Sequence, residues 1–260
     1  MYRAIDAEGW EENLDATLDL VAIAGGDGAV GEVFRRLAGS SLPATLLPLG
    51  TANNIAATLG LSADLADLVA GWADGELCRY DLGTVTLPDG VERFVEGVGG
   101  GIMAEAIALA MSDDSASKTD DEIDFALRTL RRVLAQVKPR PWLVRLDGSE
   151  ESHELVAAEA LVIGRVGPRI PLAPAADVGD ALLDVVLLGE LELRELTDYV
   201  ESRLAHASPP PPSLTARRAR EVELVPPVGV DLRVDDEPVQ SDGPLRASTG
   251  TLAVEILLPR

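Results

Sequence analysis

The feature that most constrains the fold is a pattern that occurs twice near the start of the chain. Residues 19–28 (DLVAIAGGDG) form a short apolar run that ends in a glycine turn, and apolar residues then recur at helical spacing over 29–37. The same order returns at 45–54 (TLLPLGTANN), which leads into a second helical stretch over 55–59. A strand, a turn and a helix in succession, repeated, are typical of a parallel sheet whose loops gather at the C-terminal ends of its strands. The pattern therefore predicts an open parallel α/β unit.

The chain changes character after this unit, because short strands replace the alternation of strands and helices. A hairpin is expected over 82–98, and further strands are expected from residue 142 to the end. We therefore expect an α/β domain over 1–84 and a β-rich, sandwich-like domain over 85–260, whose last strand returns to the first domain. Helices are expected within the second part at about residues 102–111, 123–136 and 191–204.

The composition excludes several classes of protein. The 260 residues include 44 Asp and Glu against 22 Lys and Arg, which gives a net charge of −22. Such a chain repels nucleic acid phosphates, so a nucleic-acid partner is not expected. Cys78 is the single cysteine, and no apolar stretch approaches the roughly 18 residues that a membrane-spanning helix needs. These features predict a cytoplasmic protein.

The first glycine turn has the chemistry of a phosphate-binding loop. Gly25, Gly26 and Gly28 leave backbone N–H groups and the positive end of the following helix beside a space that no side chain fills. An aspartate at such a site, here Asp27, usually handles Mg²⁺ or accepts a proton from an attacking hydroxyl. The alternative is a tight strand-to-helix turn in which Asp27 caps the helix.

The second glycine loop favours the phosphate interpretation. It carries Gly50, Thr51 and Asn53 at the end of the next strand, where a parallel sheet sets them beside the first loop. Two adjacent polar glycine loops predict a nucleotide-binding cradle.

Motifs along the whole chain occur in the order found in one known family. They are the GGDG turn at 25–28, the PLGTANN loop at 48–54, YDLG at 80–83, LAPAADVGDALLD at 172–184 and VDDEP at 234–238. In these motifs the chain resembles the diacylglycerol kinase catalytic-domain family of lipid kinases, which is related to the sphingosine kinases and NAD kinases. The resemblance implies an α/β nucleotide domain, a β-sandwich lipid domain and an active-site cleft between them.

The resemblance also implies an ATP- and Mg²⁺-dependent kinase and assigns roles to particular residues. The general base falls on Asp235, with Asp27 as the rival base, and the Mg²⁺ site described for bacterial relatives falls on Asp180. The residues expected to contact the nucleotide are Gly25, Gly26, Asp27, Gly28, Gly50, Thr51, Asn53 and Glu237.

The chain departs from the family pattern in several places. Asp236 stands where a glycine is usual, and a second carboxylate beside Asp235 would raise one pKa if both were buried. The alternative is that residues 235–237 form a solvated turn between two strands. Only 24 residues precede the first glycine turn, whereas family members open with a further strand, loop and helix, so the first domain is expected to be incomplete at its N-terminus. The other departures are Ala29, Ala52, Asn54 and Ala181.

The leading hypothesis is a lipid kinase that transfers the γ-phosphate of ATP to the hydroxyl of a diacylglycerol-like lipid. The lipid would be reached by peripheral contact with a membrane surface. One alternative is a non-catalytic relative that binds lipid or nucleotide, and another is a kinase for a sphingoid-type acceptor or, less favoured, for NAD. A homodimer is expected if a second copy covers the unpaired edge of an incomplete sheet.

Overall fold

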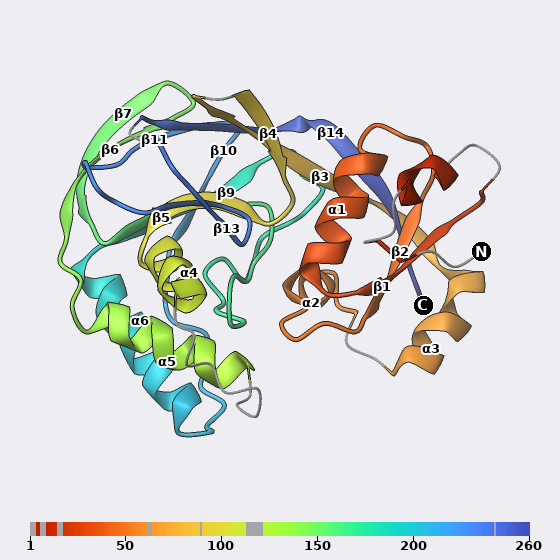
Figure 1. The fold of residues 1–260 in the computed structure, drawn as a ribbon, viewed down its shortest axis with the longest axis horizontal. Coiled ribbons are helices and arrows are strands. Elements are labelled where there is room, and N and C mark those ends of the chain that lie inside the picture. The colour runs from red at the N-terminus through yellow and green to blue at the C-terminus, as the bar shows by residue number, and fades with distance from the viewer. Residues whose placement is uncertain are drawn as a thin grey trace.

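The computed structural model describes residues 4–5, 9–14, 18–61, 64–88, 90–112, 122–241 and 243–260. Figure 1 shows two lobes that are joined by two long strands. The smaller lobe holds the N-terminal elements, and the larger lobe holds two sheets with three helices packed below them. The chain therefore has the mixed architecture expected from its motifs, with an α/β part followed by a β-rich part.

The smaller lobe is built from the two repeated units of the sequence. They form β1 (Val21–Gly25), α1 (Asp27–Leu37), β2 (Ala44–Pro48) and α2 (Asn54–Thr58). Strands β1 and β2 are parallel and in register from Val21↔Ala44 to Gly25↔Pro48, so both glycine loops leave the same edge of the sheet. The short helices η1 (Trp10–Asn13), α3 (Leu65–Ala70) and η2 (Gly71–Asp74) complete this lobe.

An eight-stranded sheet runs through both lobes. Its order is β1-β2-β14-β11-β6-β7, with β3 paired to β14 and β4 paired to β3. Strand β14 (Leu245–Leu258) lies antiparallel to β3 (Glu76–Leu87) over nearly its whole length and meets β2 in parallel at Ile256↔Ala44. The last strand therefore pairs with strands of both lobes. The remaining strands are β4 (Gly90–Phe94), β6 (Arg140–Leu146), β7 (Ser149–Leu155) and β11 (Glu221–Val225).

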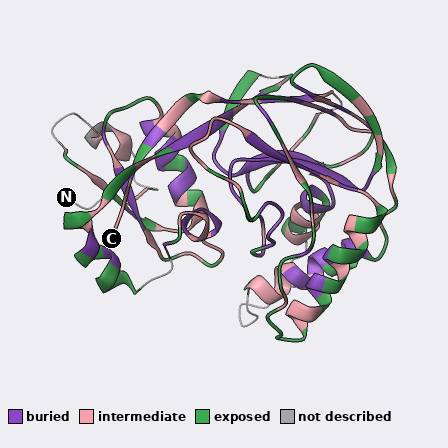
Figure 2. Ribbon diagram, turned by 180° about the vertical axis from the view of Figure 1, so that it is seen from behind, coloured by how far each residue is buried: buried purple, intermediate pink, exposed green. Residues whose placement is uncertain are grey.

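A six-stranded sheet of order β10-β9-β8-β5-β12-β13 lies in the larger lobe. Residues of β8 alternate between two cores: Ala158 and Ala160 join the core that extends through both sheets, whereas Ala157 and Leu161 join the core under the helices. Both faces of this sheet are therefore covered, and Figure 2 shows its strands as the buried centre of the lobe. The strands are β5 (Gly97–Gly101), β8 (Ala157–Leu161), β9 (Leu183–Leu188), β10 (Ala216–Ala219), β12 (Leu232–Val234) and β13 (Glu237–Val239), and the helices are α4 (Ile102–Ser112), α5 (Glu122–Leu134) and α6 (Glu190–Leu204).

The glycine run that forms β5 is a strand in the middle of this sheet. Its glycines are required by close packing, because a Cβ at Gly99 would lie 2.3 Å from Oε2 of Glu159 on the neighbouring strand. Strand β5 therefore creates the room in which charged side chains of β8 and β12 meet across it.

Candidate active site

The two glycine loops touch at their glycines. The amide of Leu49 donates to the carbonyl of Gly25 at 3.0 Å, and a Cβ at Gly50 would lie only 2.3 Å from the Cα of Gly26. A larger residue at either position would separate the loops. The structure thus brings together the two loops that the sequence predicted to be neighbours.

The start of α1 faces open space beside this contact. A Cβ placed on Gly28 would meet no atom within 4 Å, and the side chain of Thr51 on the second loop is exposed. The N-terminus of this 11-residue helix carries unpaired N–H groups and a partial positive charge, which suit an anion.

Asp27 links the first glycine loop to α2, the helix that follows the second glycine loop. Its Oδ2 accepts the amide of Asn54 at 2.8 Å and its Oδ1 accepts the amide of Ile55 at 2.9 Å. Burial raises the pKa of Asp27, and these backbone hydrogen bonds partly oppose the rise. Each oxygen keeps a lone pair, so the carboxylate can still accept a proton or a further donor.

Asn53 holds the second loop from within. It has a φ of 52°, in the left-handed region, and its side-chain Oδ1 accepts the amide of Gly50 at 2.9 Å. Its Nδ2 donates to the carbonyls of Gly50 at 2.6 Å and of Pro48 at 3.4 Å. The amide group is therefore occupied inside the loop, and Asn53 shapes this part of the site.

Asp235 lies at the end of β12 and is 6% exposed. Its Oδ1 accepts the amide of Glu96 at 2.7 Å and that of Gly97 at 3.2 Å, both oxygens lie 3.1 Å from the amide of Val95, and Oδ2 accepts the guanidinium of Arg35 on α1. These contacts fix the turn between β12 and β13 against the start of β5 and tie it to the smaller lobe. They favour an anchoring role for Asp235 over the role of general base.

Asp236 follows in the same turn and is an exposed residue. Nearby protein atoms still desolvate its carboxyl and raise its pKa, the charge of Arg233 opposes the rise, and the charges of Asp27 and Asp235 add to it. The next residue, Glu237, begins β13 with an exposed side chain. Asp235 thus holds the turn between β12 and β13, and the two other acidic residues of this segment, Asp236 and Glu237, are exposed.

Glu96 is an acidic residue of the site that the motif comparison did not find. It is 2% exposed, and its Oε2 has no hydrogen-bond partner within the described part of the chain. Burial raises its pKa well above the ordinary range, and Asp236, Asp27 and Asp235 add to the rise. A single acid inside the apolar and glycine-rich run FVEGVGGG was the sequence signal that could have identified it.

A buried ion pair supports the turn from below. Arg233 of β12 and Glu159 of β8 meet across Gly99 with Nη2 and Oε2 2.7 Å apart, and both side chains are almost fully buried. Arg233 also donates from Nη1 to the carbonyl of Asp235 at 2.6 Å. Its charge opposes the rise in the pKa of Glu96 and Asp236, so this arginine both positions the turn and moderates its electrostatics.

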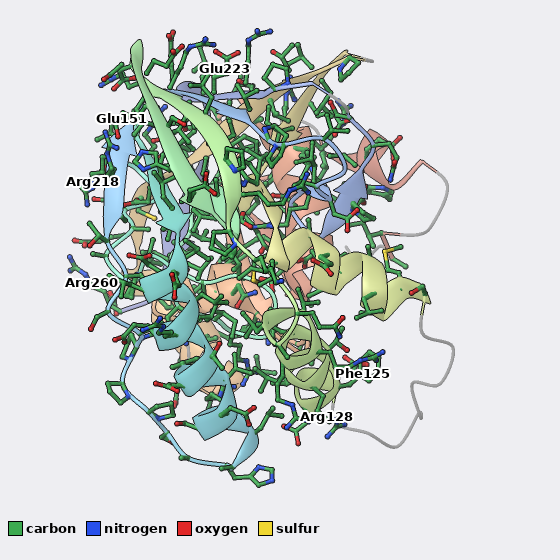
Figure 3. All side chains as sticks on the ribbon, turned by 90° about the vertical axis from the view of Figure 1, so that its left-hand side faces the viewer. Phe125, Arg128, Glu151, Arg218, Glu223 and Arg260 are labelled. Atoms are coloured by element: carbon green, nitrogen blue, oxygen red, sulfur yellow. The ribbon has the colours of Figure 1, made fainter. Side chains whose placement is uncertain are left out.

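The structure does not bring Asp180 to this cluster. Its Oδ1 accepts the amide of Leu182 at 3.0 Å, and its Oδ2 lies 3.3 Å from Nη1 of Arg218, which Figure 3 places at the outer edge of β10. Within the described ranges no group of three or more His, Cys, Asp and Glu residues is arranged to hold a metal ion. Oδ2 of Asp180 and Oδ2 of Asp184 are buried without a hydrogen-bond partner among the described residues, so a Mg²⁺-ligand role for Asp180 stays a prediction from the resemblance.

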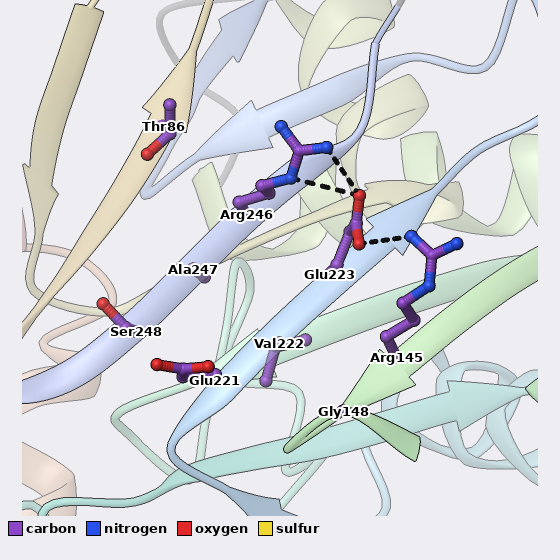
Figure 4. Close-up of a pocket in the computed structure, with 9 residues that line it drawn as sticks. All are labelled: Thr86, Arg145, Gly148, Glu221, Val222, Glu223, Arg246, Ala247 and Ser248. Carbon is purple, nitrogen blue, oxygen red and sulfur yellow. Dashed lines mark hydrogen bonds and ion pairs between the residues drawn. The ribbon is translucent and has the colours of Figure 1, made fainter. Parts of the chain in front are cut away.

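A separate hollow of about 320 Å³ lies on the outer face of the eight-stranded sheet. Figure 4 shows Glu223 at its centre between Arg145 and Arg246, at 2.5 Å and 2.9 Å. Glu223 thus pairs with both arginines of this hollow, and Arg145 also pairs with Glu150.

Two lobes, glycine loops at the end of a parallel sheet and an acidic turn opposite them define a kinase-like fold. Residues 3–85 match the model of the diacylglycerol kinase catalytic domain, and residues 98–258 match that of the YegS C-terminal NAD kinase beta sandwich-like domain. The chain belongs to this family of lipid kinases.

Individual relatives agree with the family assignment. Diacylglycerol kinase of Mycobacterium tuberculosis H37Rv is 26% identical over 251 residues, which cover 93% of this chain and 77% of the relative. Diacylglycerol kinase of Bacillus subtilis is 28% identical over 181 residues, which cover 68% of this chain and 57% of the relative.

Solved structures show the same fold. A diacylglycerol kinase from Bacillus anthracis has a TM-score of 0.63 at 16% identity and covers 92% of this chain and 76% of its own. An NAD kinase from Archaeoglobus fulgidus, solved in complex with ATP, has a TM-score of 0.51 at 13% identity and covers 94% and 79%. Across the described residues, no helix has the length and apolar character needed to cross a membrane.

Proposed function

We propose that this chain is an ATP-dependent lipid kinase that phosphorylates the hydroxyl of a diacylglycerol-like acceptor. One observation carries the proposal. Arg35 of α1, the helix that begins at the first glycine loop, donates from its guanidinium to Asp235 of the acidic turn. This contact supports a site in which a phosphate-binding loop and an acidic turn act together, as phosphoryl transfer requires.

The glycine loops would hold the phosphates of the nucleotide. The contact between Gly26 and Gly50 leaves backbone N–H groups and the start of α1 beside the open space at Gly28, and the exposed residue Thr51 follows Gly50 in the second loop. Glu237, exposed at the start of β13, remains our candidate for a contact on the nucleotide side.

Asp236 would accept the proton of the attacking hydroxyl. Its carboxylate has no hydrogen-bond or ion-pair partner among the described residues, whereas Asp235 is occupied by three backbone amides and Arg35. A raised pKa makes Asp236 a better base than a fully solvated aspartate, because its pKa then lies closer to the working pH. Asp27 is the second candidate, and its main task is to fix both loops.

Mg²⁺ would arrive with ATP and neutralise charge on its phosphates, and Asp180 stays our candidate for a protein ligand to it. The acceptor would be reached at a membrane surface, where the net charge of −22 makes binding to anionic lipids sensitive to salt. A homodimer stays an expectation from the sequence.

The test is transfer of labelled γ-phosphate from ATP to diacylglycerol in mixed micelles with Mg²⁺, at low and high salt. We expect Asp236→Asn to lower the rate by about 10²–10⁴-fold with the fold intact, as for loss of a general base. The matched control is Asp231→Asn, an exposed aspartate just before β12, which should keep the wild-type rate. Absence of transfer to diacylglycerol and to a sphingoid acceptor by the folded protein would refute the proposal.

A further inference from the structure

A polar cavity of about 480 Å³ lies between the second glycine loop, the first turn of α5 and the last turn of α6. Helices α5 and α6 pack against each other there, and the cavity reaches from them to the loop of the smaller lobe. The polar side chains that line it are Thr51, Asp124, Arg169, Arg203 and His206. Residues from three separate stretches of the chain therefore place two guanidinium groups, a hydroxyl and an imidazole around one space.

Arg169 is held next to the second glycine loop. Its Nε donates to the carbonyl of Ala52 at 3.0 Å, and its Nη2 donates to the carbonyl of Thr51. Its φ is 62°, in the left-handed region that residues with a side chain rarely adopt. The backbone is thus kept in an unfavourable conformation that sets a charged group at the mouth of the loop, and the carbonyls use only part of its five N–H donors.

Arg203 approaches the cavity from α6. Its Nη1 donates to the hydroxyl of Tyr199 at 3.1 Å, and its guanidinium lies 5.8 Å from the centre of that ring. Neither Arg203 nor Arg169 has a carboxylate partner in the part of the chain that the structure describes.

The acids near the cavity have partners of their own. Asp124 lies 3.9 Å from Nη1 of Arg128 on the same helix, and Glu122 accepts the hydroxyl of Thr51. Figure 3 shows Arg128 on α5, at the edge of the helical layer. The two cavity arginines therefore lack a carboxylate partner among the described residues of a protein whose net charge is −22, in contrast to the outer hollow, where Glu223 pairs with both arginines (Figure 4).

We propose that this cavity binds a phosphate group, with Arg169 and Arg203 as its charged ligands. Guanidinium groups suit phosphate because their paired N–H donors match its oxygens and because they stay charged. The phosphate belongs either to a nucleotide that extends from the second loop or to the head group of a phosphorylated lipid. This inference deepens the proposed function, because both sources are reactants or products of that reaction.

The test measures binding to the full chain by titration calorimetry, so it does not depend on turnover. The probes are inorganic phosphate, ATP with Mg²⁺, and micelles of a neutral detergent with and without phosphatidic acid. We expect Arg169→Gln and Arg203→Gln each to weaken binding of at least one phosphate probe by tenfold or more, and Arg169→Lys to restore part of the loss. High salt should also weaken the binding of the phosphate probes to the wild type.

Two matched controls remove equivalent charges outside the cavity. Arg165→Gln lies on the same connecting segment as Arg169, and Arg194→Gln lies on α6, where Arg194 pairs with Glu190. Both controls should bind every probe within twofold of the wild type. A loss limited to ATP assigns the phosphate to the nucleotide, and a loss limited to phosphatidic acid micelles assigns it to a lipid head group.

The proposal is overturned if wild-type protein binds none of the phosphate probes, or if both cavity variants bind all of them as tightly as the controls do. Circular dichroism and thermal unfolding of each variant establish that it is folded. A wild type that binds phosphate through these arginines but transfers none to a lipid refutes the proposed function alone.

Discussion

Asn53 and Asp235 do the same task in the two halves of the site by different means. Each is a residue other than glycine in the left-handed region, with φ values of 52° and 51°, and each is held there by its own side chain. The amide of Asn53 bonds to Pro48 and Gly50 within its own loop. The carboxylate of Asp235 bonds to groups 138 to 200 residues away in sequence. The glycine-loop half is therefore built locally, whereas the acidic turn depends on the assembled fold.

The largest expected loss of stability follows from replacing Arg233, which supports the acidic turn. Arg233→Met should lower the free energy of unfolding by about 3–5 kcal/mol, because it leaves Glu159 buried without a partner and removes a donor from the carbonyl of Asp235. Urea-induced unfolding measures this change. The double variant Arg233→Met/Glu159→Leu should recover most of the stability, and a loss below about 1 kcal/mol in the single variant would contradict the non-local anchoring of the turn.

The next largest loss of stability is expected for Asp235, which anchors the acidic turn. Asp235→Asn should cost about 2 kcal/mol, because the new amide N–H group opposes the backbone N–H groups of residues 95–97 and Arg35 loses its ionic partner. Thermal and urea unfolding measure the change, with Asp231→Asn as the exposed control in the same segment. Equal stability of the two variants would show that the carboxylate of Asp235 is not what holds the turn.

A pH-dependent effect on stability is expected at Glu96. The folded protein raises the pKa of Glu96, so it binds this proton more tightly than the unfolded chain does. The contribution of Glu96 to stability is complete below the ordinary glutamate pKa and is lost as pH rises towards the folded-state pKa. Glu96→Gln should therefore match the wild type at low pH and exceed its stability at neutral or higher pH, when urea unfolding is followed across that range. Parallel pH curves for both proteins would exclude a buried neutral acid.

The smallest effect is expected in the locally built half. Asn53→Ala should cost about 1 kcal/mol, since it removes the side-chain bonds of the second loop and keeps a Cβ in a left-handed conformation. Asn53→Gly, which adopts this conformation freely, should lose less. Urea unfolding compares the two, and a larger loss for glycine than for alanine would show that backbone strain is unimportant at this position.

Much of the fold could be predicted, because its first part is encoded by short-range patterns. The apolar run, glycine turn and helical spacing at 19–37 gave β1 and α1 close to their observed bounds, and the units at 45–59 gave β2 and α2. The strands β7, β10 and β13 were not predicted, and the run from Gly97 to Gly101 is a central strand. A strand of glycines or of mostly polar residues has no apolar alternation to reveal it, and only its neighbours in the sheet define it.

The candidate site divides in the same way. The neighbouring positions of the glycine loops followed from parallel strands, but the roles within the acidic turn did not follow from its motif. Asp235 is the saturated anchor and Asp236 is the more available carboxylate, which no spacing in VDDEP distinguishes. Asp180, whose role at a metal site stays a prediction, lies beside Arg218, because β9 and β10 pair in a register that sets Arg218 opposite Asp184.

The sequence by itself determined the α/β start, the two phosphate-type loops and the family, because each depends on residues within a few positions of one another. Tertiary structure alone decided which carboxylates are occupied, which acid is buried beside Asp27, and which arginines face a cavity without a carboxylate. The physical reason is that a side chain acquires its partner and its pKa from the distant segments packed around it. Local sequence sets the backbone of this site, and long-range packing sets its chemistry.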